Sequence, residues 1–384
     1  MNLKLKLARS ARLIDIIAGA RPNFMKIAPV LSALEQARAD GWAVQHRLIH
    51  TGQHYDRNMS GSFFEQLGIP EPDVNFGVGG GTQAEQAGGI MIAYEKLLME
   101  RRSDLCIVVG DVTSTMACAI TAKKMLVGVA HVEAGIRSGD FTMPEEINRI
   151  ATDALTDYFF TTSEHANANL KQAGIPDQRI FFVGNTMIDT LLRQRKHFRP
   201  PACWEELSLE PGKFLVLTLH RPANVDKEHQ LRDLLQAIVD HSRGYPLLFP
   251  VHPRTARILE GIGLTAPNLH LVEPLPYLEF NYLVSRAAAV ITDSGGITEE
   301  TTVLGIPCLT LRDSTERPET IEIGTNELVG TNPAAILPVL EKLFSGQWKT
   351  GGIPPLWDGQ TGPRIVQTLH HLMTSPSGMM TNGK

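Results

Sequence analysis

Three carboxylates, Asp111, Glu133 and Glu145, have the types and spacing that acid–base chemistry requires. Asp111 directly follows the apolar run 105–110, and Glu133 directly follows a second apolar run at 127–132. Both runs have the length and β-branched content of buried parallel strands, and the segment between them predicts a helix. Because a β-α-β unit delivers the ends of both strands to one edge of a parallel sheet, we expect these two acids to lie together where α/β folds bind their ligands.

The third acid lies at the start of a predicted helix. Glu145 and Glu146 follow Pro144, a pattern typical of a first helical turn with acids favoured by the helix dipole. A loop with two glycines connects this helix to Glu133, and Arg149 follows one turn later. We therefore expect Glu145 to reach the same sheet edge, with Arg149 close behind it.

Each acid also has a structural alternative. Asp111 could cap the helix that follows it, and Glu133 could form an ion pair with Arg137. A glutamate in a first turn, such as Glu145, is usually a partner of the helix dipole. The clustering of three carboxylates favours the catalytic interpretation over these alternatives.

Two cations surround the first predicted turn. Residues 12–18 predict a strand and residues 24–38 a helix, with Arg21 before the helix and Lys26 in its first turn. The GxGxxG motif that lets a pyrophosphate approach the backbone is missing, so we expect no NAD. Cations are unfavourable at a helix N-terminus and indicate an anionic ligand there, although a pair of solvated charges is the alternative.

The second half of the chain carries a predicted phosphate site. The apolar strand 289–292 leads through Asp293 into Ser294, Gly295 and Gly296, and then into a predicted helix. Free backbone N–H groups and the helix dipole at such a turn suit a diphosphate, although a tight turn without a ligand is the alternative. Glu300, one turn into this helix, is placed to accept hydrogen bonds from ribose hydroxyls.

Two histidines also end predicted strands in this half. His220 is followed by Arg221, and His252 is followed closely by Arg254. A lone histidine is usually structural, but this pairing indicates a second anion contact or an acid.

Composition limits the kind of ligand and the compartment. The net charge of −5 and the pI of about 6.2 favour neither nucleic acid nor an anionic membrane, so we expect a small substrate. The four cysteines lie mostly in apolar runs without metal-like spacing, which is typical of reduced core residues in a cytoplasmic protein. The apolar run that follows the basic N-terminus is too short for a secretory signal, so we expect none. No stretch approaches the ~20 apolar residues of a membrane span.

Length and periodicity predict two domains. A chain of 384 residues exceeds one ordinary domain, and strands alternate with helices along both halves, which predicts parallel sheets and an α/β fold. We expect one Rossmann-like domain over residues 1–185 and a second over 186–362, with an irregular linker near 199–212. A last helix follows within 363–384.

Taken together, the motifs resemble the non-hydrolysing UDP-N-acetylglucosamine 2-epimerases. The resemblance runs from Arg21 to Gly330. It rests on Arg21-Pro22 with Lys26, Gly110-Asp111, the run from His131 to Arg137, Pro144 to Glu146 with Asn148-Arg149, His220-Arg221, Asp293 to Gly296, and Glu316 to Glu319. It implies a GT-B-like architecture: two Rossmann-like domains facing a cleft, with the C-terminal helix returning to the first domain. It also implies a cytoplasmic homodimer.

The resemblance further implies the chemistry. Such an enzyme would interconvert UDP-GlcNAc and UDP-ManNAc with neither NAD nor metal, by anti elimination of UDP and its re-addition to 2-acetamidoglucal. Asp111, Glu133 and Glu145 match the family's catalytic acids, and Arg21, His220 and the turn at 294–296 would hold the charge of the departing UDP. Four alternatives stay open: an epimerase of a modified UDP-sugar such as a 2,3-diacetamido glucuronate, a hydrolysing epimerase, a GT-B glycosyltransferase and a non-enzymatic nucleotide-sugar sensor.

Overall fold

The computed structural model describes residues 11–52, 67–225, 227–251 and 253–374, which divide into two compact units. Unit 1 comprises Met1–Thr190 with Asp358–Lys384, and unit 2 comprises Leu191–Trp357. Each unit is built around its own parallel sheet with helices between the strands. The predicted α/β class with parallel sheets is therefore confirmed. Within the described residues, no helix is long and apolar enough to cross a membrane.

The described part of unit 1 has a seven-stranded sheet in the order β3-β2-β1-β4-β5-β6-β7. The strands are β1 (Arg12–Ala18), β2 (Val44–His50), β3 (Val74–Asn75), β4 (Leu105–Val109), β5 (Gly128–Val132), β6 (Tyr158–Thr161) and β7 (Ile180–Phe182). The order reverses between β1 and β4, which makes their carboxyl ends the switch point at which α/β folds bind ligands. All five residues of β4 are buried because helices cover both faces of the sheet.

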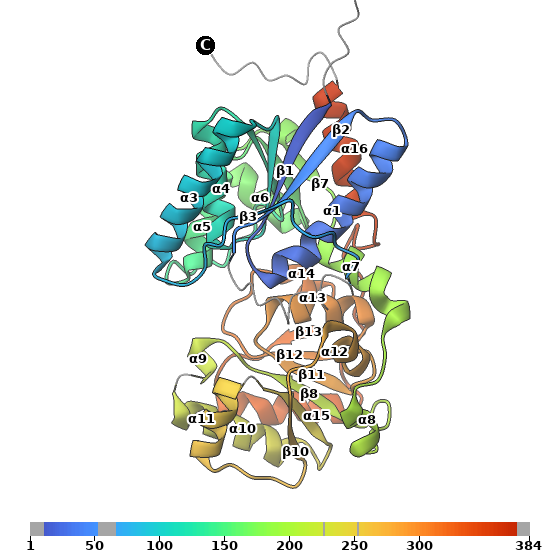
Figure 1. Ribbon diagram of the computed structural model, residues 1–384. Helices are drawn as coiled ribbons and strands as arrows, with labels where there is room; N and C mark the ends of the chain where they lie inside the picture. Colours follow the sequence, from blue (N-terminus) through green and yellow to red (C-terminus); the bar gives the residue numbers. More distant parts are fainter. Residues whose placement is uncertain (1–10, 53–66, 226, 252, 375–384) are drawn as a thin grey trace, which may run out of the picture. The chain divides into compact units, whose positions relative to one another are not determined.

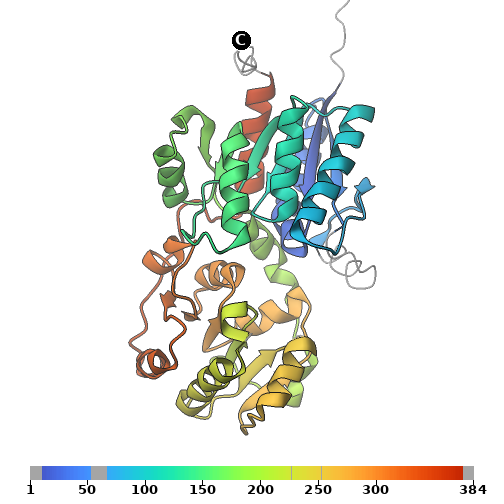
Figure 2. The ribbon, with the colours of Figure 1, turned by 90° about the vertical axis from the view of Figure 1, so that its left-hand side faces the viewer.

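Helices form a layer on each face of this sheet, as Figure 1 shows. They are α1 (Arg21–Ala39), α3 (Gln83–Glu100), α4 (Thr113–Lys124), α5 (Pro144–Leu155), α6 (Glu164–Gln172) and α16 (Thr361–Thr374), with a 3₁₀ turn at Asp177–Arg179. Helix α7 (Thr186–Gln194) leads from unit 1 into unit 2, where a 3₁₀ turn follows at Arg195–His197. Figure 2 turns the layer of α3, α4 and α5 toward the viewer. On the other side, α16 packs against α1, so the last described helix returns to the first unit as expected.

The described part of unit 2 has a six-stranded sheet in the order β10-β9-β8-β11-β12-β13. The strands are β8 (Leu215–Thr218), β9 (Leu247–Pro250), β10 (Leu269–Val272), β11 (Ala289–Thr292), β12 (Cys308–Thr310) and β13 (Asn326–Leu328). The helices are α8 (Ala202–Glu206), α9 (Pro222–Val225), α10 (Glu228–His241), α11 (Pro253–Ile262), α12 (Tyr277–Val284), α13 (Gly295–Leu304), α14 (Pro318–Glu322) and α15 (Ile336–Phe344), with a 3₁₀ turn at Pro333–Ala335. Its switch point lies between β8 and β11.

Several predicted boundaries were wrong for identifiable reasons. Helix α1 begins at Arg21 rather than at Phe24, because the Asn23 side chain accepts the N–H of Ala20 at 2.9 Å and secures an earlier first turn. The segment predicted as an irregular linker contains α8. Trp204 of that helix packs edge-on against Phe214, with ring centroids 5.8 Å apart, and so joins the core of unit 2.

The four cysteines are free and buried, as expected of reduced core residues. Cys106 and Cys118 lie in the core between the sheet of unit 1 and its α3–α4 layer. Cys203 and Cys308 lie in the core on the α8–α12 side of the sheet of unit 2.

Candidate active site

The carboxyl ends of β4 and β5 carry two of the expected acids. The strands pair in register through Val109 and Val132, and the Gly110 N–H donates to the carbonyl of Val132 at 3.1 Å. Asp111 and Glu133 therefore leave the same edge of the sheet from neighbouring strands. They stand beside the switch point between β1 and β4.

Glu133 is held in an unusual backbone conformation. Its φ is +73°, in the left-handed region that costs a non-glycine residue on the order of 1–3 kcal/mol. The conformation is fixed by hydrogen bonds from the N–H groups of Glu133 and Ala134 to the carbonyl of Phe160, at 2.9 and 3.1 Å. The side chain is buried and its Oε2 lies 2.5 Å from Nζ of Lys26. Strain of this kind gathers at functional sites because it fixes a side chain where relaxed backbone would not.

Gly110 leaves room for the same lysine. Its φ is +67°, and a Cβ at this position would lie 3.2 Å from Lys26 Nζ and 3.5 Å from Asn23 Nδ2. The Asn23 amide donates to the carbonyl of Val109 at 3.1 Å. Helix α1 is therefore tied to the end of β4, and from this helix Lys26 reaches Glu133 at the end of β5.

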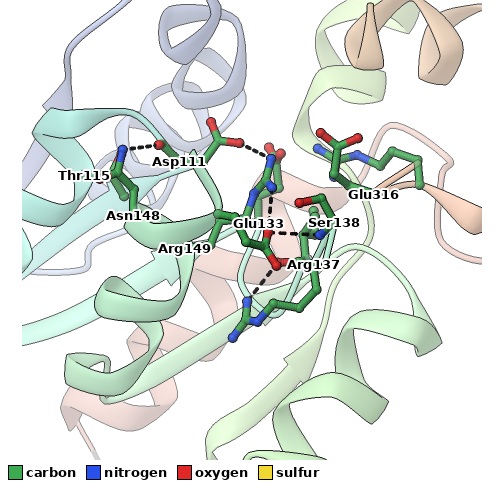
Figure 3. A network of polar contacts seen from close by, with 12 residues as sticks. Asp111, Thr115, Glu133, Arg137, Ser138, Asn148, Arg149 and Glu316 are labelled. Atoms are coloured by element: carbon green, nitrogen blue, oxygen red, sulfur yellow. Dashed lines mark hydrogen bonds and ion pairs between the residues drawn. The ribbon is translucent and has the colours of Figure 1, made fainter. Parts of the chain in front are cut away.

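Asp111 forms an ion pair with Arg149 of α5 (Figure 3). Asn148, on the same helix, donates from Nδ2 to the main-chain carbonyl of Asp111 at 2.9 Å. Arg149 also donates to Glu146 at 3.0 Å. The structure thus places Arg149, which was expected close behind Glu145 at this sheet edge, between the carboxylates of Asp111 and Glu146.

The neighbours Glu145 and Glu146 lie in different environments. Glu146 is buried and accepts the N–H groups of Ser138 and Gly139 at 2.9 and 3.1 Å. Burial alone would raise the pKa of Glu146, but these N–H donors and Arg149 together lower it below its ordinary value. Glu145 is exposed in the first turn of α5. Glu146 therefore organises the loop, whereas the carboxyl group of Glu145 is open to solvent.

Arg137 has a partner other than the expected one. The sequence offers Arg137 as an ion-pair partner of Glu133, but in the structure its Nη1 lies 2.7 Å from Asp153 Oδ2. Asp153 also lies 2.7 Å from Nδ1 of the fully buried His131. This cluster under the sheet edge was not anticipated. The spacing of Glu146, Arg149 and Asp153 could have indicated it, since steps of three and four place side chains on one face of a helix.

Two expected residues cannot be placed fully. His252 lies outside the residues that the structure describes, and so does the side chain of Arg21, although its backbone forms the first residue of α1.

The expected phosphate turn of unit 2 opens α13. Ser294 is the N-cap residue, but its side chain accepts no hydrogen bond from the first turn. The backbone N–H groups of that turn are therefore not capped by this side chain. Gly295 follows, with Gly296 in the same turn, and a Cβ built at Gly295 would meet nothing within 4 Å. Packing within the unit does not require a glycine at position 295. The missing side chain instead leaves the helix N-terminus accessible to an anion.

His220 lies beside this turn because Asp293 holds it there. Asp293 is fully buried and accepts the N–H groups of His220 and Arg221, the latter at 2.9 Å, while its Oδ1 lies 2.7 Å from His220 Nδ1. Burial would raise the pKa of Asp293, but the bonds from His220, Asn224 and Arg221 lower it overall. The imidazole itself is 63% exposed, so it is available to a ligand.

Glu300 lies inside α13 and is buried. The hydroxyl of Tyr277 donates to its carboxyl group at 2.8 Å. Burial raises the pKa of Glu300 to about 7, offset in part by hydrogen bonds from Tyr277 and Asn281. The expected ribose contact would therefore involve a carboxyl group that titrates near neutrality.

Two doubly wound parallel sheets, each with polar and charged groups at its switch point, define a GT-B-like α/β protein. The family model of UDP-N-acetylglucosamine 2-epimerase matches residues 36–370. The chain belongs to this family of isomerases.

Two relatives, one of them with a crystal structure, illustrate the similarity. The UDP-N-acetylglucosamine 2-epimerase of Methanocaldococcus jannaschii is 40% identical over 369 residues, covering 93% of this chain and 98% of the relative. A crystal structure of the M. jannaschii enzyme in complex with UDP-GlcNAc and UDP matches with a TM-score of 0.82 and 39% identity, over 94% of this chain and 99% of that chain. The UDP-2,3-diacetamido-2,3-dideoxy-D-glucuronate 2-epimerase of Pseudomonas aeruginosa is 38% identical over 317 residues, 82% of this chain and 87% of the relative.

Proposed function

We propose that this chain interconverts UDP-GlcNAc and UDP-ManNAc by inverting C2 of the sugar. Family membership and the similarity to an enzyme crystallised with UDP-GlcNAc and UDP support this substrate. The observation that supports the chemistry is the pair of acids at neighbouring strand ends. Asp111 forms an ion pair with Arg149, and Glu133 forms one with Lys26. Proton removal and return at one carbon require such a pair.

The reaction must break a C2–H bond that is barely acidic. A carboxylate accepts the C2 proton while the anomeric C1–O bond breaks, its electron pair leaves with UDP, and a C1=C2 double bond forms. A carboxylic acid then protonates C2 from the opposite face as UDP re-adds to C1. Asp111, Glu133 and Glu145 are our candidates for these proton transfers, and we assign no face to any of them.

Holding the departing UDP is a separate task. We assign it to Arg21, to His220, and to the α13 N-terminus with Ser294 and the two glycines. Backbone N–H groups and a cation that are already in place stabilise charge as it develops, without reorganisation at the moment of bond cleavage. The open space at Gly295 and the exposed imidazole of His220 support this assignment. Lys26, Arg149, His252 and Glu300 complete the proposed substrate contacts.

Each domain has its own role in this proposal. We propose that residues 1–185, with 363–384, form the domain of the catalytic acids, and that 186–362 form the UDP-binding domain. We also propose a cytoplasmic homodimer serving polysaccharide biosynthesis. The exposed side chains of Ile92, Met99 and Leu126 on the α3–α4 layer support the dimer, since exposed apolar groups often mark an interface. Sedimentation equilibrium tests it.

A modified UDP-sugar is the second candidate substrate. The relative from P. aeruginosa is named for a UDP-2,3-diacetamido glucuronate and is nearly as similar to this chain as the M. jannaschii enzyme. The same carboxylates would serve either sugar, because both reactions invert C2.

Parallel incubations with the two candidate sugars in D₂O test the reaction. We expect UDP-GlcNAc in D₂O to give UDP-ManNAc with deuterium at C2 and UDP still attached, as read by NMR and mass spectrometry. Exchange only with the diacetamido glucuronate would transfer the assignment to that sugar. Free ManNAc would indicate a hydrolysing epimerase. Absence of exchange with either sugar would overturn the proposal in favour of a transferase or a sensor.

A further inference from the structure

The imidazole of His131 lies between two hydrogen-bond acceptors. It is fully buried on β5, with Nδ1 2.7 Å from Asp153 Oδ1 and Nε2 2.8 Å from the carbonyl oxygen of Gly110. A carbonyl only accepts, and an ionised carboxylate only accepts. Both ring nitrogens must therefore carry a proton, which makes His131 a buried cation.

Two donors other than His131, Arg137 and the N–H of Gly135, also favour the ionised state of Asp153. Its Oδ2 lies 2.7 Å from Nη1 of Arg137 and accepts the N–H of Gly135 at 3.1 Å. Burial would raise the pKa of Asp153, but His131 and Arg137 together hold it below its ordinary value. A buried carboxylate between two cations is the charge-compensated arrangement that a protein interior tolerates.

The other end of the imidazole restrains the backbone next to Asp111. Nε2 of His131 is hydrogen-bonded to the carbonyl oxygen of Gly110, the residue immediately before Asp111. Nδ2 of Asn148 donates to the carbonyl oxygen of Asp111 itself at 2.9 Å. The peptide groups on both sides of the Asp111 Cα are thus fixed from two different elements, β5 and α5. Arg149 fixes the carboxylate beyond them (Figure 3).

We propose that His131 and Asn148 are positioning residues that clamp the two peptide groups flanking Asp111 and so aim its carboxylate at C2 of the sugar. The inference rests on the proposed function, in which Asp111 takes part in proton transfer. Neither side chain touches the substrate in this scheme, and both act through Asp111. Displacing a reacting group by about 1 Å costs roughly 10²-fold in rate, so a loosened clamp should be visible in turnover.

Asn148→Leu gives the cleanest variant, because leucine has a similar size but cannot donate to the Asp111 carbonyl. We expect its kcat to fall by about 10-fold or more while the Kd for UDP, measured by calorimetry, stays within about 2-fold. His131→Gln should show the same split. His46→Gln is the matched control, because His46 is a partly buried histidine of β2 whose nearest charged partner is Glu35 at 3.8 Å, and its kcat should not change.

A double-mutant cycle separates positioning from a general structural effect. In an Asp111→Asn background, adding Asn148→Leu should change the residual rate of C2 exchange by less than about 2-fold, because the group that Asn148 aims is already lost. An independent structural contribution would lower that rate again by the full factor. Additivity of the two substitutions would overturn the proposal.

NMR on the wild-type protein tests the His131 part without any variant. Protein labelled with ¹⁵N at histidine should show one imidazole with protons on both ring nitrogens at neutral pH, and this signal should vanish in His131→Gln. A single ring proton would overturn the cationic clamp. An active wild type whose His131→Gln and Asn148→Leu variants keep full kcat would overturn this inference alone, whereas a wild type without C2 exchange would overturn the proposed function with it.

Discussion

The adjacent carboxylates Glu145 and Glu146 have different surroundings. Glu146 is engaged by two backbone N–H groups and Arg149, whereas its neighbour Glu145 is exposed in the first turn of α5. The carboxylate of Glu146 is therefore already engaged by three donors, whereas that of Glu145 is open to a ligand.

The first prediction at this scale concerns the three candidate acids. Asp111→Asn, Glu133→Gln and Glu145→Gln should each lower turnover by ~10² or more, because the amides keep the shape and lose the ionisable group. The Kd for UDP should barely change. Turnover, calorimetry and melting temperature together check this, with exposed Glu95→Gln on α3 as control. A variant with near-wild-type turnover would remove that residue from the mechanism.

The second prediction concerns Glu300 and pH. The folded state raises the pKa of Glu300 from 4.5 to about 7, so between these values the folded protein binds a proton that the unfolded chain releases. The proton on Glu300 therefore stabilises the folded protein at low pH. As the pH rises from 4.5 to about 7, the free energy of unfolding should fall by up to about 3 kcal/mol because of this group.

Glu300→Gln should remove this loss. The difference in free energy of unfolding between wild type and variant, from urea titrations at several pH values, should shift in favour of the variant as pH rises from about 4.5 to about 7. Glu341→Gln, an exposed glutamate of α15, serves as the control. Parallel pH curves for wild type and Glu300→Gln would contradict the raised pKa.

At the scale of the element, the candidate functional groups occupy helix starts and strand ends. Helix α13 begins directly after β11, and α5 presents Glu146, Arg149 and Asp153 along one face. Strand ends supply acids in unit 1 and a helix N-terminus supplies backbone N–H donors in unit 2. A single substitution at such a position tests its contribution to ligand binding.

Gly295→Val tests the N-terminus of α13. A Cβ there meets no protein atom within 4 Å, so the variant should fold, yet the side chain would occupy the approach of the diphosphate. We expect UDP binding to weaken by at least ~1 kcal/mol in calorimetry. Gly261→Val in α11, where a Cβ also meets nothing within 4 Å, should leave the affinity unchanged. Equal affinities for both variants would make the turn at 294–296 structural only.

At the scale of the molecule, the chain crosses from unit 1 to unit 2 within α7 and returns near Asp358. Helix α16 completes unit 1 through the buried side chains of Ile365 and Leu369, and the N–H of Gly362 donates to Asp189 at 2.8 Å. The last helix of the chain therefore stabilises the unit that holds the acids, although unit 2 precedes it in sequence.

Hydrogen exchange tests this division. Ile365→Ala should cost about 2–5 kcal/mol and speed amide exchange in β1 and α1, while β8 and β11 keep their protection because they belong to unit 2. Leu340→Ala in α15, buried in the core of unit 2, should give the reciprocal pattern. Equal acceleration in both sheets after either substitution would show that the units do not unfold separately.

Much of the fold was already determined by the sequence, because burial on both faces of a parallel sheet requires continuous apolar runs that are easy to recognise. Strand β1 was predicted at its observed bounds, and β4 and β5 were placed together because a β-α-β unit brings the carboxyl ends of its two parallel strands to one sheet edge. The residue types that follow these strands also indicated acid chemistry and an anion site.

Tertiary structure alone decided which side chains meet. Short elements such as β3 and β13 depend on pairing with a distant strand, and no local pattern specifies that. Arg137 pairs with Asp153, and Glu146 rather than Glu145 holds the loop, because each choice depends on the position of α5 relative to the sheet edge. The conformation of Glu133 at positive φ likewise follows from hydrogen bonds to β6, which chain neighbours cannot supply.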